Sequence, residues 1–139
     1  ERCTFGTQFL CKDYLLATGP GATNNLILRI QNNLGSGIAV NPAPAVSNSD
    51  QFLCSTPVFY DADGLTLLTA EASGDYLVGD GDIFEVHYAG GSCSGGGFES
   101  SGGSKFKADI ELYYYDPRSG PSFSHTVKGE IFATVEEFV

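Results

Sequence analysis

The sequence has few basic residues. Seven Lys and Arg stand against seventeen Asp and Glu, so the net charge at pH 7 is −10. A surface of this sign repels the phosphate backbone of nucleic acids and the headgroups of anionic lipids. The sequence also contains no apolar run of about eighteen residues, the length that a membrane-spanning helix needs. We therefore expect no nucleic-acid partner and no membrane contact by these residues.

Cysteine spacings typical of metal sites are also missing. None of the four cysteines forms a CxxC or CxxCH motif, and His87 and His125 lie far from them in sequence, so a zinc or haem site has little support. An even number of cysteines in a Gly-rich acidic chain indicates two disulfides and an extracellular location. The alternative is four buried thiols. Of the three pairings, we favour Cys3–Cys11, which flank a short loop, and Cys54–Cys93, which join central loops.

Helical periodicity is absent too, since no window of about a dozen residues keeps a period of 3.6. Eighteen Gly and six Pro separate runs that are rich in β-branched and aromatic residues, and such runs favour strands. These runs recur at a spacing of roughly ten residues, which is typical of a β-sandwich. We predict one all-β domain, residues 1–139, with a Greek-key or immunoglobulin-like sandwich of about seven strands and two disulfides.

The clearest strands form a hairpin near the end of the sequence. Apolar and polar residues alternate over 105–116 and again from 123, with a Pro/Gly/Asp turn between the two runs. This alternation is the period of a half-buried strand. The inward faces are expected to hold Phe106, Ala108, Ile110, Leu112 and Tyr114 in the first run, and Phe123, His125, Val127, Ile131, Ala133 and Val135 in the second.

Three other segments have a distinct character. Residues 1–24 are predicted to form a leader segment that is pinned by the Cys3–Cys11 disulfide and contains one short strand. Residues 90–104 are Gly/Ser-rich, and we expect a loop tethered by Cys93 instead of a linker between domains. Over 38–46, Pro42 and Pro44 remove backbone donors at alternate positions, which favours a strand at a sheet edge.

Two pairs of aspartates suggest a calcium site. Asp61-x-Asp63-Gly64 has the start of a calcium-binding loop, and Asp80-x-Asp82 follows not far along the sequence. Calcium prefers several oxygen ligands at about 2.4 Å, but the remaining ligands of an EF-hand are absent. The alternative is two acidic β-turns, in which Asp and Gly supply the turn geometry. No other cofactor is expected.

Exposed aromatic residues are candidates for contact with a ligand or a neighbouring subunit. In the first strand of the hairpin, parity places Tyr114 inward and Tyr113 and Tyr115 outward, where two rings could stack on carbohydrate or pair across strands. Phe132 and Phe138 fall among the polar positions of the second strand. An apolar residue between charged ones is typical of a packing surface between subunits.

No catalytic motif is present. Ser124 and His125 are neighbours, but adjacent strand residues point to opposite faces, so their side chains cannot hydrogen-bond to each other. The sequence contains no G-x-S-x-G elbow. We expect no catalytic residues, and we expect both histidines to be ordinary surface or half-buried residues.

Short motifs follow one another in a particular order. They are Cys3-Thr4-Phe5-Gly6, Phe9-x-Cys11-x-Asp13, Leu26–Asn33 followed by Leu34-Gly35-x-Gly37-Ile38-x-Val40, Cys54, Gly81-Asp82-Ile83-Phe84-x-Val86, Cys93, Gly103–Ile110 and Ser124–Gly129. In this order, over nearly the whole sequence, they resemble the head domain of archaeal type IV pilin-like proteins.

The resemblance implies a structural protein and no enzyme. Proteins of this family carry a class III signal peptide and an apolar helix that packs in the core of a filament, with the β-rich head outside. The first residues of this sequence match the point where that helix gives way to the head, so we expect a head domain without the helix. The resemblance also implies identical subunits as partners and an extracellular, cell-surface location.

Two alternatives remain at this stage. In the first, the chain is a helix-free filament subunit in which residues 1–24 or the segment 136–139 complete the sheet of a neighbour by donor-strand exchange. In the second, it is a secreted binding module that depends on carbohydrate or calcium. Outward tyrosines and the aspartate pairs would be the features of such a module.

Overall fold

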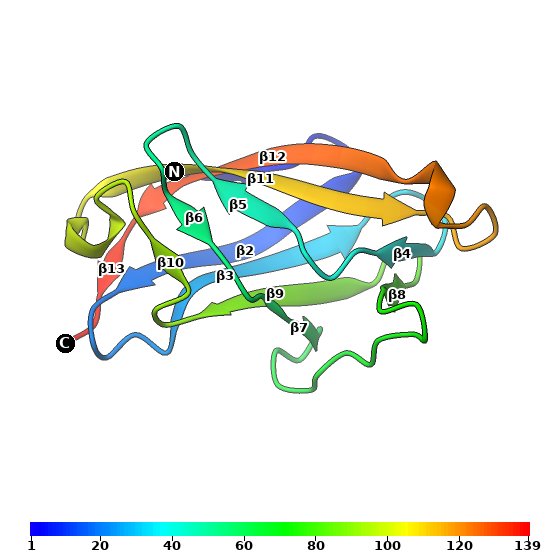
Figure 1. Ribbon diagram of the computed structural model, residues 1–139, viewed down its shortest axis with the longest axis horizontal. Helices are drawn as coiled ribbons and strands as arrows, with labels where there is room; N and C mark the ends of the chain where they lie inside the picture. The colour runs from blue at the N-terminus through cyan, green and yellow to red at the C-terminus, as the bar shows by residue number, and fades with distance from the viewer.

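Regular alternation of apolar and polar residues produces the five longest strands. The computed structural model describes residues 1–139, and its longest strands are β2 (Phe9–Thr18), β3 (Asn24–Asn32), β9 (Ile83–Ala89), β11 (Lys105–Tyr115) and β12 (His125–Thr134). These strands form most of two sheets that pack face to face (Figure 1). The chain is therefore all-β with two disulfides, Cys3–Cys11 and Cys54–Cys93, as the sequence predicted.

Shorter strands complete the sheets. Thirteen strands are present in all, and seven of them have only two or three residues. The short and intermediate strands are β1 (Arg2–Thr4), β4 (Ile38–Val40), β5 (Ala45–Ser47), β6 (Leu53–Cys54), β7 (Val58–Asp61), β8 (Tyr76–Val78), β10 (Cys93–Ser94) and β13 (Glu136–Glu137). Two 3₁₀ turns, η1 (Phe98–Ser100) and η2 (Pro121–Phe123), lie before and after β11.

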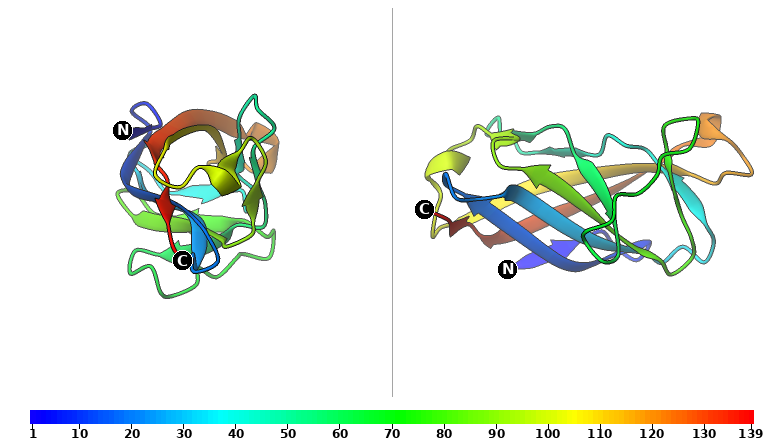
Figure 2. Two further views of the ribbon diagram at one scale, coloured as in Figure 1. Left: turned by 90° about the vertical axis from the view of Figure 1, so that its left-hand side faces the viewer. Right: turned by 90° about the horizontal axis from the view of Figure 1, so that it is seen from below.

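The eight-stranded sheet has the order β1-β12-β11-β5-β6-β10, with β4 pairing with β11 and β8. The five-stranded sheet has the order β13-β2-β3-β9-β7. Every pairing is antiparallel except that of β13 with β2, which is parallel. Because β12 leads directly into β13, the end of the chain crosses from one sheet to the other, as both views in Figure 2 show.

One contiguous core fills the space between the sheets. It contains 27 buried residues drawn from both sheets, and several of them are completely inaccessible. Most of the hairpin side chains that were predicted to face inward lie in this core. Alternate residues of β3 and β9 lie there too. The fully buried members include Leu26, Ile30, Val86, Tyr88, Ala108, Ile110, Ile131 and Val135.

The start of the second hairpin strand differs from the prediction. Phe123 is 65% exposed and His125 is also exposed, whereas Val127 and the later inward residues are buried. β12 begins only at His125, after η2, and its first two residues, His125 and Thr126, are both exposed. The apolar–polar alternation of the sequence therefore begins before the first buried residue of this strand, Val127.

The first residues form more structure than the predicted leader. β1 pairs with β12, and β2 is a ten-residue strand between β13 and β3. Phe5 and Phe9 are buried in the common core. The Cys3–Cys11 disulfide joins β1 of one sheet to β2 of the other, so residues 1–24 help to close the sandwich.

The strand predicted at an edge, residues 38–46, is divided in two and is not at an edge. β4 pairs with β11 and β8, and β5 pairs with β11 and β6. Pro42 and Pro44 lie in the break between them. Since proline cannot donate to a ladder, the ladder stops at these residues, and each half finds partners on both sides.

The Gly/Ser-rich segment 90–104 is tethered as predicted. Cys93 in β10 is bonded to Cys54 in the neighbouring β6, and Phe98 in η1 is completely buried. The Phe98 ring packs against Phe52 and Phe106, with ring centroids 5.1 Å and 5.3 Å away. One covalent bond and one aromatic cluster thus fix a segment of otherwise low sequence complexity.

Phe98→Ala tests how much of this tethering is due to the ring. Truncating a fully buried Phe costs about 3–5 kcal/mol of unfolding free energy, because transfer and cavity terms add. Phe123→Ala is the matched control, since Phe123 is 65% exposed and its loss should cost within about 0.5 kcal/mol. Urea unfolding of both variants measures the difference, and equal costs would contradict the assigned packing.

Candidate functional site

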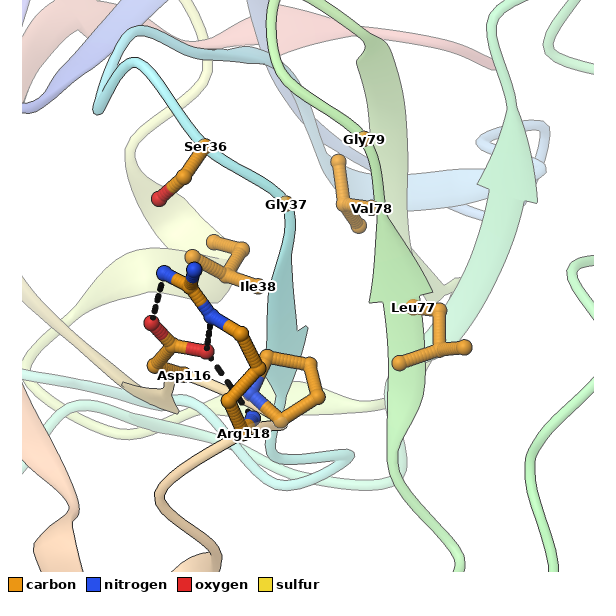
Figure 3. A pocket seen from close by; sticks show the side chains of 9 residues that line it. Ser36, Gly37, Ile38, Leu77, Val78, Gly79, Asp116 and Arg118 are labelled. Atoms are coloured by element: carbon orange, nitrogen blue, oxygen red, sulfur yellow. Dashed lines mark hydrogen bonds and ion pairs between the residues drawn. The ribbon is translucent and has the colours of Figure 1, made fainter.

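The largest hollow on the surface lies at the end of the sandwich where β11 turns toward β12. This groove has a volume of about 450 Å³, and Figure 3 shows its lining. Three segments contribute to it, namely the loop before β4, the end of β8 with the turn that follows it, and the Asp116–Pro121 turn. The lining residues are Ser36, Gly37, Ile38, Leu77, Val78, Gly79, Asp116, Pro117 and Arg118.

Glycines keep the groove open along two of its walls. Gly37 and Gly79 place no side chain in it, so Ile38, Val78 and the half-exposed Leu77 supply its apolar surface. A Cβ atom on Gly79 would come within 2.7 Å of Asp82 Oδ2, and that same carboxylate accepts a hydrogen bond from the Gly79 amide at 3.2 Å. A side chain at residue 79 would therefore displace the Asp82 carboxylate from this hydrogen bond.

An ion pair forms the third wall of the groove. The Arg118 guanidinium donates to both carboxylate oxygens of Asp116, through Nε at 3.1 Å and Nη2 at 2.7 Å. The Arg118 amide donates to the same carboxylate at 2.9 Å. The Arg118 side-chain hydrogen bonds lower the pKa of Asp116 to about 2. The groove can hold an apolar group beside this charged pair.

The four candidate calcium ligands lie in two separate turns. Asp63 accepts hydrogen bonds from the Leu65 and Thr66 amides and from the Thr66 hydroxyl. Asp82 accepts a hydrogen bond from the Gly79 amide. Asp61 accepts from the Ala62 amide, and Asp80 is exposed in the turn before β9. No group of three or more His, Cys, Asp or Glu is placed to hold a metal ion, and these carboxylates act as turn residues.

The turn that contains Asp63 covers a charged cluster that the sequence did not predict. Glu85 Oε2 accepts a hydrogen bond from Arg29 Nη1 at 2.6 Å, and Glu85 Oε1 lies 2.8 Å from His87 Nε2. The Tyr60 ring lies over the His87 ring, with centroids 4.1 Å apart. A Cβ atom on Gly64 would lie 2.8 Å from Glu85 Oε1, so the glycine lets the turn approach.

Register explains why this cluster was missed. Arg29 and Glu85 are opposite each other in the β3–β9 ladder, and Tyr60 is opposite Glu85 in the β7–β9 ladder. In the sequence they were recognisable only as outward-facing residues of separate strands. The one local signal was the spacing of Glu85 and His87, which places both side chains on the same face of β9.

The two outward tyrosines have different environments, and the prediction for Tyr115 is wrong. Tyr115 is 9% exposed, and its hydroxyl donates to Asp75 Oδ2 at 2.7 Å. Asp75 is itself buried just before β8, so the segment before β8 closes over the outward side of Tyr115. Tyr113 remains half-buried, and its hydroxyl donates to Glu111. Two adjacent exposed rings for carbohydrate stacking are therefore not present on this strand.

The two phenylalanines of the second hairpin strand also separate. Phe132 lies on the outer face of the eight-stranded sheet, with Arg2 and Lys105 at 5.6 Å and 5.9 Å from its ring centroid. Phe138 follows β13 at the opposite end from the groove and is 41% exposed. The Phe138 backbone is held by the Thr18 carbonyl and the Gly21 amide. Both rings are accessible to a neighbouring molecule.

The histidines occupy unremarkable positions. His87 is largely covered, within the cluster beneath the Asp63 turn. His125 is exposed, and its ring lies 5.4 Å from that of Tyr114. Ser124 precedes β12 and is exposed as well.

Comparison with known proteins adds no family assignment. No protein-family model, curated protein or solved structure matches the chain. The structure contains no helix that is long and apolar enough to cross a membrane. The two disulfides are consistent with an extracellular protein.

Acid should weaken the two turns that depend on Asp63 and Asp116. Hydrogen bonds lower both pKa values to about 2, below the usual value of about 3.9. Their contribution to stability is complete above that usual value and disappears as the pH falls toward 2. Asp63→Asn should therefore make the melting temperature fall less steeply between about pH 4 and pH 2. Asp80→Asn is the matched control, and equal slopes for the two variants would contradict the assignment.

Tyr115→Phe should destabilise the fold, because it leaves the buried Asp75 carboxylate without its hydroxyl donor. Loss of a hydrogen bond to a charged group costs about 1.5–3 kcal/mol. Tyr113→Phe removes a hydroxyl that donates to the more accessible Glu111, and this control should cost less than about 1 kcal/mol. Thermal unfolding of both variants measures the costs. Equal effects would show that Tyr115 has no special structural role.

Proposed function

We propose that the chain is the head domain of an extracellular filament subunit of the type IV pilin-like kind, with a structural role and no catalytic one. The observation that carries this proposal is the placement of the two chain ends. Both lie in the half of the sandwich away from the groove (Figures 1 and 2). Glu1 is held there by an ion pair of 3.1 Å with Lys105, the first residue of β11. The Asp116–Pro121 turn follows the other end of that strand.

This arrangement suits a head that is displayed from a filament. A helix joined to Glu1 would enter at one end of the sandwich, so the groove and its surrounding turns would face outward at the other. Functional contacts of β-rich domains commonly reside on such loops, since the strands beneath hold them in place. The groove would then be the part of the head available for adhesion.

The distribution of charge also supports an exterior position. Six of the seven basic side chains form ion pairs with acidic ones, so the excess of carboxylates gives the surface its net charge of −10. Such a charge keeps the domain soluble and makes neighbouring heads repel one another. Salt or divalent cations would reduce this repulsion, which is screened over about 10 Å at 0.1 M.

The groove favours binding over catalysis. Its one carboxylate, that of Asp116, is held by Arg118, and the rest of its lining is mainly apolar or glycine. An apolar hollow with one charged edge suits recognition of a surface group. The two disulfides, one between the sheets and one within the eight-stranded sheet, suit an exposed extracellular position.

Donor-strand exchange ranks second as a mechanism of assembly. β1 and β13, the two ends that could be donated, already pair with β12 and β2 of the same chain. The outer edge of β7 is covered by residues 66–68 through backbone hydrogen bonds to Asp61 and Phe59. Exchange would therefore have to break existing pairs. A carbohydrate- or calcium-dependent module ranks third, since Tyr115 is buried and the aspartates cap turns.

Immunogold microscopy with antibodies against this 139-residue chain tests the proposal on cells of its source. Gold particles are expected along extracellular filaments, because every subunit would display one head. Preimmune serum is the control. Label that is confined to the cell interior, or that avoids filaments, would overturn the proposed function.

Sedimentation velocity and negative-stain microscopy of the chain at low and high salt distinguish the two assembly mechanisms. A head without its helix should form no filaments under either condition. Filaments formed by the chain alone would favour donor-strand exchange over the pilin-like mechanism.

A further inference from the structure

A buried amide connects two of the three walls of the groove. Asn32, the last residue of β3, is completely inaccessible. Its Nδ2 group donates to the Ser36 carbonyl at 2.9 Å, in the loop before β4, and to the Gly79 carbonyl at 3.1 Å, in the turn after β8. A third acceptor, the Val78 carbonyl, lies 3.3 Å from the same nitrogen. One side chain is therefore bonded to both walls.

The other polar atoms of Asn32 hold the same two segments. Its Oδ1 accepts a hydrogen bond from the Leu34 amide at 3.0 Å, which fixes the turn that leads to Ser36. The Asn32 amide donates to the Asp82 carbonyl, and the Asn32 carbonyl accepts from the Gly81 amide, both at 2.9 Å. All the hydrogen-bonding groups of Asn32 are thus directed at the loop before β4 or at the end of β8 and the turn that follows it.

The chemistry of the site suits an asparagine. A side-chain amide supplies two N–H donors and one carbonyl acceptor, and here it meets three carbonyl oxygens and one N–H group. Buried backbone groups need such partners, because a carbonyl that leaves water without a donor costs free energy. An apolar side chain at this position would remove the donor that the two walls share.

A second buried asparagine lies at the other end of β3. Asn25 is 5% exposed, and its Nδ2 group donates to the Ala17 carbonyl at 3.0 Å. Its Oδ1 accepts from the Gly91 and Cys93 amides at 2.9 Å and 3.1 Å. At about 3.3 Å per residue, roughly 23 Å of strand separate it from Asn32. Asn25 therefore holds segments at the end of the sandwich away from the groove.

We propose that Asn32 is the positioning residue of the groove, which it holds open before a ligand arrives. Its hydrogen bonds fix the separation of the two walls, and this separation places Ile38 and Val78 in the lining. The third wall is set independently, because the Asp116 turn continues from β11, which pairs with β4. A preformed groove spares its ligand the entropic cost of ordering the walls.

This inference deepens the proposed function and rests on it, because it takes the groove as the binding part of the head. The walls that Asn32 holds present the aliphatic side chains of Ile38, Leu77 and Val78. The only charged lining residues, Asp116 and Arg118, are paired with each other. The class of ligand that fits is therefore an uncharged apolar group, and cyclohexanol is a suitable probe of that class.

Methyl NMR of the 139-residue chain with Asn32→Ala tests the positioning role. Asn25→Ala is the matched control, since each variant removes a buried amide from one end of β3. Both should lower the melting temperature by about 5 °C or more. Only Asn32→Ala should shift and broaden the methyl signals of Ile38, Leu77 and Val78, because the two walls would then move on the microsecond-to-millisecond timescale. Equal changes in both variants, or none in either, would overturn the proposal.

Titration with cyclohexanol measures whether the groove is preformed. In the unmodified chain the probe should shift the same three methyl-bearing residues, with a dissociation constant in the millimolar range. Asn32→Ala should weaken this binding by about fivefold or more, and Asn25→Ala should leave it within about twofold. No response of these methyl groups in the unmodified chain, or equal weakening by the two variants, would contradict the inference.

Exchange of the Asn32 side-chain amide with solvent provides a measurement that needs no variant, should Asn32→Ala fail to fold. Its Nδ2 protons should exchange at least about a hundredfold more slowly than those of exposed Asn33, whose Nδ2 group donates to the Thr7 carbonyl. Similar rates would show that the walls separate readily and would overturn the proposal. The immunogold result depends on none of these measurements, so failure of the positioning role and failure of the proposed function can be told apart.

Discussion

The structure depends on burial of alternate residues from the long strands in one core. Side chains of a strand point alternately to its two faces, so fixing the inward residues also fixes the outward ones. Ala108, Ile110 and Ile131 are completely buried, and this burial sets the register of β11 against β12. The same register places Lys107 beside Phe132 and Asp109 beside Glu130 on the outer face. The pattern of surface charge is thus a consequence of core packing.

The sequence predicted those parts of the fold that depend on local pattern. The β11–β12 hairpin, both disulfides and the tethered 90–104 segment could be read from alternation, turn residues and cysteine spacing. Features that depend on strand order could not. Arg29 and Glu85 meet only because β3 and β9 are neighbours, although 56 positions separate them in sequence. Tyr115 has outward parity, but a segment about forty residues earlier in the chain covers it, and no periodicity within one strand contains that information.

Turn chemistry accounts for most of the acidic motifs that suggested a metal. Asp63 and Asp82 both accept hydrogen bonds from backbone amides of their own turns, and the neighbouring Gly64 and Gly79 allow close approach of another chain segment or a carboxylate. Asp and Gly at these positions serve a turn just as well as they would serve a cation site. Sequence alone cannot distinguish the two uses, because the difference lies in whether the carboxylates of separate turns converge. Here the Asp63 turn packs over Glu85, and Asp82 closes its own turn beside the groove.

The Cys3–Cys11 bond joins the two sheets at one edge of the eight-stranded sheet. β1 has only three residues, and one of them, Arg2, lies beside Phe132. Three ladder positions alone hold a strand weakly, so β1 relies on the disulfide to β2 and on Phe5, which is buried against Gly129. Without the disulfide, β1 would keep its ladder with β12, the ion pair of Arg2 with Glu130 and the packing of Phe5 against Gly129. The disulfide therefore fixes β1 against β2 and closes the sandwich at this edge.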